Sequence, residues 1–351
     1  MMVPKLSPAL ISESTETLVS LHVPTCERVA AVLARHVIPI DQEDTKLPEL
    51  SRTEIGNFYL FLVAICHQTS PKGLPPLAGK VNGRSLRGWD YLSARLEGDS
   101  ATDHSLLAPK EWGHMTGERL ACLFRDSEAG DRLTEPGARA LLIRNLGEVM
   151  ERNAWKAAED IYEKSGHRIA QGSANLLELL SRFRAYDDPV CKKSYFFLGV
   201  MRNAGLWSYV DNENLGAPVD YHEVRGHLRI GTVTVHDAGL REKLFRGEPV
   251  NAEEDIAIRR AVLEAILLLS RLTGLKNPSQ LHYLFWNVFR SCCTRESPHC
   301  FRCPSRCTLP ERYVPLAIHE DGVRRCPFSS VCQSAGREPK LLEHVFKTDY
   351  Y

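Results

Sequence analysis

The sequence lacks an excess of either charge, because 44 lysine and arginine residues balance 44 aspartate and glutamate residues among its 351 positions. Without a net charge, no long-range field draws the whole molecule toward nucleic acid or a membrane surface. This balance argues against a protein that binds its partner only through electrostatic attraction. A local cluster of basic residues can still bind phosphate groups, so nucleic acid stays open as a partner.

The sequence also lacks long apolar runs, internal repeats and low-complexity tracts. Its longest apolar runs, such as YLFLVAIC and AILLL, fall far short of the roughly 20 residues that span a bilayer. The opening stretch MMVPKLSPALISESTETLVSLH has no basic flank followed by an apolar core, which a secretory signal would need. We therefore expect a soluble, cytoplasmic protein without a membrane partner. Its length allows one two-lobed domain or two ordinary domains.

Cysteine, in contrast, is abundant and unevenly distributed, with eleven residues in the chain. Four are scattered in apolar contexts and are expected to be small core residues: Cys26, Cys66, Cys122 and Cys191. The other seven lie close together further along: Cys292, Cys293, Cys300, Cys303, Cys307, Cys326 and Cys332. In a reducing compartment, such a group favours a metal site over a set of disulfides.

Helical periodicity dominates the chain before the cysteine-rich part. The clearest helix lies in NAEEDIAIRRAVLEAILLLSRLTG, where Asn251 is a side-chain cap, Glu254 follows three residues later and Gly274 marks the end. Similar spacing of apolar residues predicts helices within 137–166 and 173–183.

Other segments depart from this amphipathic pattern. Residues 58–68 are apolar on nearly all sides, so we expect a central, buried helix there. HLRIGTVTV, residues 227–235, shows β-branched alternation and predicts a short strand or an extended connection. Proline, glycine and charge concentrate at 70–90 and 95–110, which we expect to be loops. After about residue 290 helical periodicity disappears, and we place the one compositional boundary there.

The cysteine-rich segment CCTRESPHCFRCPSRC contains a C-x6-C-x2-C-x3-C spacing formed by Cys293, Cys300, Cys303 and Cys307. Thiolates this close in sequence can converge on one centre, and four cysteines suit either zinc or a [4Fe-4S] cluster. Proline follows both Cys303 and Cys326 and opposes helix formation there, as expected for a loop wrapped around a metal. The spacing alone slightly favours zinc.

CTRESPHCFRC resembles the iron–sulfur loop of the helix-hairpin-helix DNA glycosylases, in the branch of endonuclease III and the adenine glycosylases. Their spacing is C-x6-C-x2-C-x5-C, and the first three cysteines match it. Cys307 comes two residues early, whereas CPFSSVC, which ends at Cys332, has the last spacing beyond an insertion. The resemblance implies a [4Fe-4S] cluster, with Cys326 or Cys332 as alternatives to Cys303 or Cys307.

PVDYHEVRGHLRIG, residues 218–231, resembles the V-D-T-H-x-x-R-x-x-x-R-L-G stretch of the same superfamily. The resemblance implies that Asp220 is the catalytic carboxylate, with His222 close by in the substrate pocket. The chemistry agrees, because breaking a base–sugar bond builds positive charge on the sugar. A fixed carboxylate stabilises that charge and can activate water. An isolated aspartate in such a context is more often a helix cap or a turn residue.

FLVAICHQTSPKG, residues 61–73, resembles the early helix and loop of these glycosylases, which often read L-L-S-x-Q-x-T/S. There a glutamine near the helix end contacts DNA or the target base. The resemblance therefore makes Gln68, with His67 beside it, a candidate for base recognition. The alternative is a helix C-terminus at which His and Gln side chains satisfy the last carbonyl groups.

The superfamily's hairpin, L-P-G-x-G-x-K/R-T-A, has an incomplete counterpart in DDPVCKKSYFFLGVM, residues 187–201. Lys192 and Lys193 are present, but the glycine pair that lets backbone amides approach a DNA phosphate is missing. A lysine at this place is the Schiff-base nucleophile in the lyase-competent members, so both lysines are candidates for that role. The alternative is a solvated lysine pair at a helix start, and we expect a monofunctional enzyme.

A second resemblance runs from about residue 25 to about residue 290. The queuosine salvage proteins, which are nucleotide N-glycosylases with a glycosylase-like fold, carry a comparable aspartate followed by a stretch like LREKLFRGEP. They also have counterparts of RGWDYL, AIRR and the pair Tyr350 and Tyr351, but read L-W-D where this chain reads FWN. They lack the cysteine loop. In either family Trp89 and Trp286 could stack on a base, with buried core tryptophans as the alternative.

Together the segments predict an all-α, two-lobed fold like that of the helix-hairpin-helix glycosylases. Residues 1–289 would form two lobes with the active-site cleft between them, and residues 290–345 a cysteine-rich metal loop. The expected activity is hydrolysis of the base–sugar bond of a damaged or modified base in DNA, flipped into a pocket of a monomeric enzyme. Among the ligands, three arginines could meet phosphate: Arg295, Arg302 and Arg306. The alternatives are the same cleavage on a free queuosine-type nucleotide, and a non-catalytic nucleic-acid-binding protein with a zinc clip.

Overall fold

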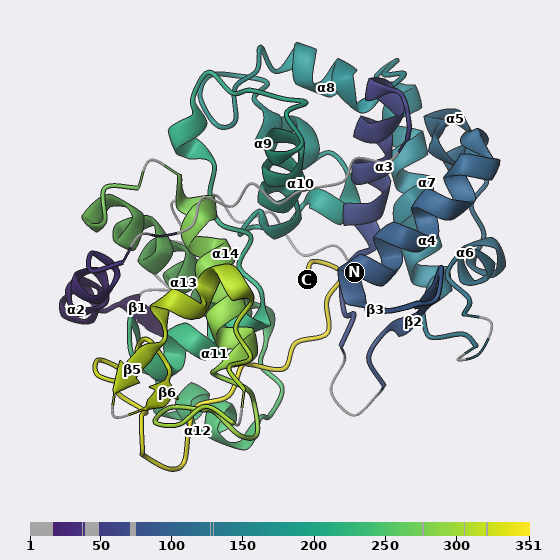
Figure 1. Ribbon diagram of the computed structural model, residues 1–351. Coiled ribbons are helices and arrows are strands. Elements are labelled where there is room, and N and C mark those ends of the chain that lie inside the picture. The colour runs from purple at the N-terminus through teal and green to yellow at the C-terminus, as the bar shows by residue number, and fades with distance from the viewer. Residues whose placement is uncertain are drawn as a thin grey trace. The chain divides into compact units, whose positions relative to one another are not determined.

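The computed structural model describes residues 17–36, 38, 49–70, 75–126, 128, 130–275, 277–304, 306–320 and 322–351 (Figure 1). The described chain is mainly helical, as the sequence predicts, and its strands pair two by two. None of these helices is both long and apolar enough to cross a membrane. The chain divides into two compact units, which we call the terminal unit (residues 1–41 and 216–347) and the middle unit (residues 42–215 and 348–351).

The middle unit is built around one central helix, α3 (Arg52–Ile65). In chain order its further elements are β2 (Ala78–Val81), β3 (Arg84–Arg87), α4 (Gly88–Thr102), η1 (His104–Leu107), α5 (Pro109–Trp112), α6 (Gly117–Leu123), α7 (Pro136–Arg152), α8 (Ala158–Lys164), α9 (Leu176–Leu180), η2 (Arg184–Tyr186), α10 (Lys192–Asn203) and η3 (Asn212–Asn214). The helices predicted within 137–166 and 173–183 are therefore present, although the first segment is divided into α7 and α8.

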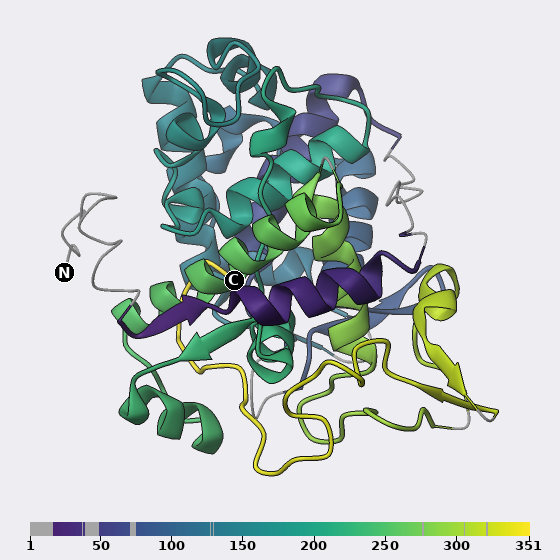
Figure 2. The ribbon, with the colours of Figure 1, turned by 90° about the vertical axis from the view of Figure 1, so that its left-hand side faces the viewer.

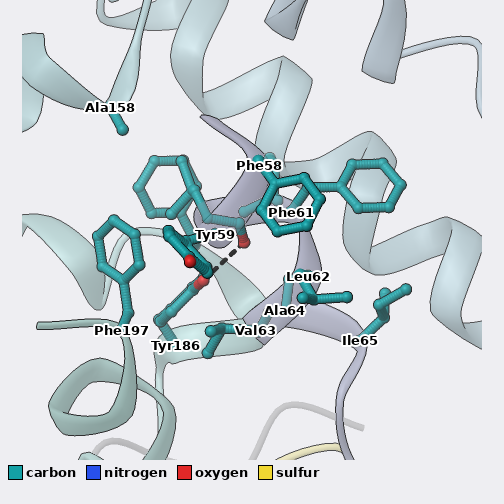
Figure 3. Close-up of a cluster of buried hydrophobic side chains, with 14 of the residues drawn as sticks. Phe58, Tyr59, Phe61, Leu62, Val63, Ala64, Ile65, Ala158, Tyr186 and Phe197 are labelled. Atoms are coloured by element: carbon teal, nitrogen blue, oxygen red, sulfur yellow. Dashed lines mark hydrogen bonds between the residues drawn. The ribbon is translucent and has the colours of Figure 1, made fainter. Parts of the chain in front are cut away.

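Helix α3 begins at a capping box, in which Ser51 and Glu54 each accept a backbone N–H of the other. Every residue from Ile55 to Ile65 is buried, which confirms the prediction of a central, buried helix. α4, α7, α8 and α10 pack around it. Figure 3 shows the aromatic side chains of this core, where the Tyr186 hydroxyl donates to the Leu60 carbonyl at 2.6 Å. The helix ends at Ile65, earlier than the predicted segment does.

The prediction of loops at 70–90 and 95–110 is wrong for most of the described residues, while residues 71–74 lie outside them. β2 and β3 form an antiparallel hairpin, and α4, η1 and α5 follow it. In α4 only Tyr91, Leu92, Leu96 and Ser100 are buried. Contacts of these few side chains with the core therefore hold a helix whose other positions are polar or small, and whose apolar periodicity is weak.

The described part of the terminal unit combines two short two-stranded sheets, five α-helices and the cysteine-rich segment. In chain order its elements are β1 (Val19–Leu21), α2 (Val23–Leu33), α11 (Tyr221–Ile230), β4 (Val233–Val235), α12 (Ala238–Arg246), α13 (Ala252–Leu272), α14 (Pro278–Ser291), η4 (Glu311–Leu316), β5 (Ile318–Glu320) and β6 (Val323–Arg325). Figure 2 shows β1, in purple, beside β4, in green, and these strands pair antiparallel. α13 begins with the predicted capping box of Asn251 and Glu254, and ends just before Gly274.

Residues 227–235 do not form one extended segment, which corrects the sequence-based prediction. Residues 227–230 complete helix α11, and only Val233–Val235 form strand β4. Gly231 separates the two, because its φ of +86° is a left-handed conformation that ends a helix and favours glycine. The β-branched residues that suggested a strand therefore pair in a sheet only beyond this glycine.

Helix α11 lies unusually close to α14. A Cβ atom built on Gly226 would lie 2.1 Å from the ring of Phe289, so only glycine fits at this crossing. The cysteine-rich segment belongs to the same unit, because Leu309, Tyr313 and Phe328 join the core formed by α11, α13 and α14. The compositional change near residue 290 is thus not a boundary between the compact units.

Candidate functional site

Asp220 is the N-cap of helix α11. Its Oδ1 accepts hydrogen bonds from the backbone N–H groups of His222 at 2.8 Å and Glu223 at 3.2 Å. Its Oδ2 accepts a third hydrogen bond, from the indole Nε1 of Trp286 at 2.9 Å. Asp220 is nevertheless partly exposed. Asp220 therefore is a helix cap, as the alternative interpretation of the sequence expected, and at the same time a carboxylate oriented by three donors in a partly exposed residue.

Aromatic and basic side chains surround this carboxylate. The guanidinium of Arg290 lies over the Trp286 ring, 4.1 Å from its centre, so one face of the indole is already covered. The His222 ring meets the Trp286 ring edge to face at 6.2 Å. Burial lowers the pKa of His222 to about 4, although the nearby Asp220 opposes that shift. At neutral pH the imidazole is therefore uncharged, with one nitrogen that donates a hydrogen bond and one that accepts.

A buried acid–base pair lies directly behind Asp220. Glu223 is fully buried, and its Oε2 accepts the backbone N–H of Asp220 at 3.1 Å. Its Oε1 lies 2.9 Å from Nδ1 of His282, which is also buried. Burial raises the pKa of Glu223, whereas His282 opposes the shift. This pair fixes the start of α11 from behind, and with it the direction in which Asp220 points.

Two arginines of α11 join the helix to the cysteine-rich segment. Arg225 donates from Nε to the Cys293 carbonyl at 2.7 Å and forms a buried ion pair with Glu343 at 2.9 Å. Arg229 donates to the Thr294 carbonyl at 2.7 Å and to the Sγ of Cys293 at 3.5 Å. Because the same helix begins with Asp220, the geometry of the carboxylate and that of the cysteine-rich segment depend on each other.

Five cysteines line one small cavity in the terminal unit. The cavity measures about 20 Å³, and we call it the cysteine cavity; its lining consists of Cys292, Cys293, Cys300, Cys326 and Cys332 with Ile230, Phe289, Phe328 and Ser329. The described residues contain no group of three or more His, Cys, Asp or Glu side chains arranged to hold one metal ion. What the structure provides is a set of thiols around a common, mostly apolar space.

Four of these thiols each have an N–H donor directed at the sulfur. The side chain of Arg229 serves Cys293, and backbone N–H groups serve the others: Gly336 at Cys300, Phe328 and Ser329 at Cys326, and Ser334 at Cys332. Burial nevertheless raises the pKa of Cys293, Cys300 and Cys332, the last to about 12, and a hydrogen bond with Cys292 together with burial raises the pKa of Cys326. A buried thiol of this kind keeps its proton unless a metal replaces it, and N–H···S hydrogen bonds then stabilise the thiolate. This donor set fits a four-thiolate cluster.

The sequence left open which cysteines complete the ligand set, and the structure separates the candidates. Cys326 and Cys332 share the cavity with Cys293 and Cys300. Cys303 and Cys307 do not line it, and their side chains are hydrogen-bonded to each other. The cavity thus brings Cys326 and Cys332, and not Cys303 and Cys307, to the same space as Cys293 and Cys300.

The three arginines expected to contact phosphate differ in their surroundings. Arg295 donates from Nε to Glu343 Oε1 at 2.6 Å and shares that carboxylate with Arg225. Its guanidinium is thus already engaged within the protein, although one carboxylate balances only one of the two positive charges. Arg302 and Arg306 are exposed. Of the predicted phosphate contacts, these two are exposed, whereas Arg295 is partly buried and paired.

The other predicted site residues lie in the middle unit, at the C-terminal end of α3. Lys193 is completely buried, and its Nζ donates to the Ala64 carbonyl at 2.5 Å and lies 3.2 Å from His67 Nδ1. Arg139 is also buried and donates to the carbonyls of Ile65 and, at 2.8 Å, His67. These two cations, rather than the side chains of His67 and Gln68, satisfy the last carbonyls of the helix.

Burial lowers the pKa of both Lys193 and His67 at this helix end. It lowers the pKa of Lys193 to about 7, and the neighbouring cations Lys192 and Arg139 lower it further. Burial also lowers the pKa of His67, and the adjacent Lys193 adds to the shift, so the imidazole stays neutral. Both side chains are almost inaccessible to solvent. Their contacts stabilise the C-terminal end of α3.

Gln68 and Trp89 also have partners in the middle unit. Gln68 adopts a left-handed conformation with φ of +47°, and its Nε2 donates to the Thr348 carbonyl at 2.8 Å. Trp89 is half-buried and meets the Phe196 ring edge to face at 4.7 Å. The Lys192 ammonium lies 5.2 Å from the centre of the same Phe196 ring. The amide of Gln68 is thus occupied by the chain itself.

The predicted residues therefore fall into two groups, one in each unit. The terminal unit brings together Asp220, His222, Trp286 and the cysteine cavity, whereas the middle unit contains His67, Gln68, Trp89, Lys192 and Lys193. Sequence reasoning missed Glu223 and His282 behind the carboxylate. Glu223 could have been found, because D-Y-H-E is an aspartate followed three residues later by a glutamate, the signature of a capping box. His282 gave no such signal.

Comparison with protein-family models finds no match for this chain, and no curated protein matches it.

Proposed function

We propose that this chain is an N-glycosylase of the helix-hairpin-helix type that hydrolyses a base–sugar bond, with Asp220 as the catalytic carboxylate. The observation that carries the proposal is the orientation of Asp220. Two backbone N–H groups and the Trp286 indole hold both carboxylate oxygens, and the residue still is partly exposed. A carboxylate used only as a cap does not need a third donor at its second oxygen.

The proposed chemistry follows from this geometry. As the bond between the sugar C1′ and the base nitrogen breaks, its electron pair leaves with the base and the sugar becomes positively charged. Asp220, fixed before the reaction, stabilises that charge without reorganisation. Water then adds to C1′, and the carboxylate accepts the proton that the water releases. The Glu223–His282 pair acts indirectly, by fixing the helix start that directs Asp220.

A Schiff-base mechanism through the middle-unit lysines has less support. Lys193 has a pKa near 7, which would provide a neutral amine, but its side chain is fully buried and donates to Ala64. Lys192 is largely buried, with its ammonium near the Phe196 ring. We therefore assign hydrolysis, not covalent catalysis, to the enzyme, and expect borohydride to trap no adduct.

We assign a [4Fe-4S] cluster to Cys293, Cys300, Cys326 and Cys332. The four thiols line one cavity and each has an N–H donor, which supports this ligand set. When bound, the cluster would provide a rigid, electron-accepting centre. The chain's own part is structural: Arg225 and Arg229 connect the ligand loop to the helix that Asp220 caps.

The favoured substrate is a modified or damaged base in DNA, and the exposed Arg302 and Arg306 support it. A free modified nucleotide, such as a queuosine phosphate, is the second candidate. One observation favours it: Arg295, which the sequence assigned to phosphate, is paired with Glu343. Fewer basic side chains at the loop weaken the case for a long nucleic-acid partner.

Mass spectrometry of the bases released from modified DNAs and from modified nucleotides tests the activity. Wild-type protein should release a base from one of these classes, whereas Asp220→Asn should release it far more slowly. If neither class yields a base with cluster-loaded protein, the proposed activity is wrong.

A further inference from the structure

Ser329 lines the cysteine cavity, and its side-chain hydroxyl is buried. The side chain belongs to the turn between Cys326 and Cys332, and the residue is 8% exposed. Among the described residues its Oγ has no hydrogen-bond partner, although the backbone N–H of Ser329 donates within the turn. A buried hydroxyl without a partner is unfavourable, because it has lost its hydrogen bonds to water.

The only polar atoms that the lining of the cavity offers besides this hydroxyl are the sulfur atoms of the five cysteines and backbone groups. The other walls are Ile230, Phe289 and Phe328, which provide no side-chain acceptor. Sulfur in a metal-bound thiolate or in an inorganic sulfide is a better acceptor than a protonated thiol, because it carries more negative charge. A cluster at this place would therefore supply the missing partner.

We propose that the Ser329 hydroxyl donates a hydrogen bond to a sulfur atom of the cluster held by Cys293, Cys300, Cys326 and Cys332, and thereby raises its reduction potential. The inference rests on the proposed cluster and goes beyond it, because it assigns a residue that tunes the cluster. Reduction adds one electron to the cluster, and its sulfur atoms become more negative. A donor at sulfur stabilises the reduced form more than the oxidised form, so its removal lowers the potential.

Ser329 is a better test of this effect than the other donors. Arg229 also approaches a cysteine sulfur, but its replacement would break its bonds to Thr294 and Leu341 and loosen helix α11. The backbone donors cannot be removed by an ordinary substitution. The Ser329 hydroxyl makes no hydrogen bond to the described protein, so its removal leaves the hydrogen bonds of the fold in place.

The experiment measures the midpoint potential of anaerobically purified, cluster-loaded protein by titration with dithionite, followed by absorbance and electron paramagnetic resonance. Ser329→Ala should have a more negative potential than wild type at equal iron content. Ser334→Ala, in the neighbouring turn, keeps its backbone N–H and should keep the wild-type potential. A second pair, Ser329→Thr and Ser329→Val, has the same shape and differs only in the hydroxyl. Of these two, the valine variant should have the more negative potential.

The outcomes distinguish this inference from the proposed cluster. Wild-type protein with stoichiometric zinc, no iron and no reducible centre would remove the cluster and the inference together. A full cluster whose potential is the same in wild type and Ser329→Ala would overturn only the role of Ser329. If Ser329→Ala fails to retain iron, equal potentials in the threonine and valine variants would overturn it instead.

Discussion

The two units place charged side chains at helix ends in opposite ways. At the C-terminal end of α3 in the middle unit, Lys193 and Arg139 are buried and donate to the last carbonyls of the helix. At the N-terminal end of α11 in the terminal unit, Asp220 caps the helix but stays partly exposed, and a tryptophan orients its free oxygen.

This difference shows which charged groups are available for chemistry. Lys193 and Arg139 donate their hydrogen bonds to backbone carbonyls inside the protein. They therefore stabilise the fold and have few donor groups available for a substrate. Asp220 uses hydrogen bonds that fix its direction while its position remains accessible. Orientation combined with exposure, and not a perturbed pKa alone, therefore distinguishes the candidate catalytic residue.

Removal of the Asp220 charge should have the largest effect on activity. Asp220→Asn should lower the turnover by on the order of 10²–10³-fold while binding changes little, because the carboxylate matters most when the sugar becomes positive. The rate of base release and the dissociation constant, measured on a verified substrate, test it. Asp237→Asn is a matched control, since Asp237 caps α12 through the Leu240 N–H at 2.6 Å. Asparagine is as good a cap as aspartate, so the control should keep wild-type turnover. Equal rates for the two variants would refute the role of Asp220.

Within the terminal unit, the cysteine cavity predicts which thiols matter. Cys326→Ser and Cys332→Ser should lose most of the bound iron, which is about four atoms per chain for a [4Fe-4S] cluster. Cys303→Ser and Cys307→Ser should keep it, because their side chains pair with each other and do not line the cavity. Iron and sulfide analysis of anaerobically purified variants decides between the two sets. Loss of iron in the second pair alone would return the ligands to the local C-x6-C-x2-C-x3-C spacing.

For the middle unit, the buried lysine predicts a pH effect on stability. The pKa of Lys193 is lowered from 10.5 to about 7 in the folded protein, so between these values the unfolded state binds more protons. The free energy of unfolding should therefore rise with pH across this window, and Lys193→Met should lack that contribution. Urea unfolding at pH 7, 8 and 9 measures it. Lys156→Met, at an exposed position, should keep the wild-type slope. Equal slopes in wild type and Lys193→Met would show that folding does not lower the pKa of Lys193.

The smallest effect concerns the loop arginines. If DNA is the substrate, replacing Arg302 and Arg306 together by alanine should lower the slope of log K against log salt by about 1.8, since each lost phosphate contact contributes about 0.9. Arg295→Ala should leave the slope nearly unchanged and mainly destabilise the loop, because it removes one of the two arginine partners of Glu343. Binding isotherms at several salt concentrations test both. A slope that changes with Arg295 and not with the other two would contradict the assignment of exposed and paired arginines.

Several features could be read from the sequence because they depend on neighbours in the chain. The capping box of α13 and the burial of α3 follow from local side-chain chemistry and apolar composition. The helical turns at 95–110 could not be read in this way, because a few contacts with the core hold them. Likewise, Asp220 was recognisable, whereas His282 was not, because only the packing of α14 against α11 brings it to Glu223.

A mainly helical chain, an aspartate at a helix start and a surplus of cysteines in one segment can be predicted from the sequence alone. Which thiols lie together depends on how the chain folds. Strands β5 and β6 pair antiparallel and turn the inserted segment back, so that the backbone N–H of Cys326 donates to the Cys300 carbonyl at 3.3 Å. Local spacing favoured Cys303 and Cys307, but a hairpin between distant residues brings Cys326 and Cys332 to the cavity. Contacts made across such a loop depend on the folded core that closes it, and no periodicity in the sequence records them.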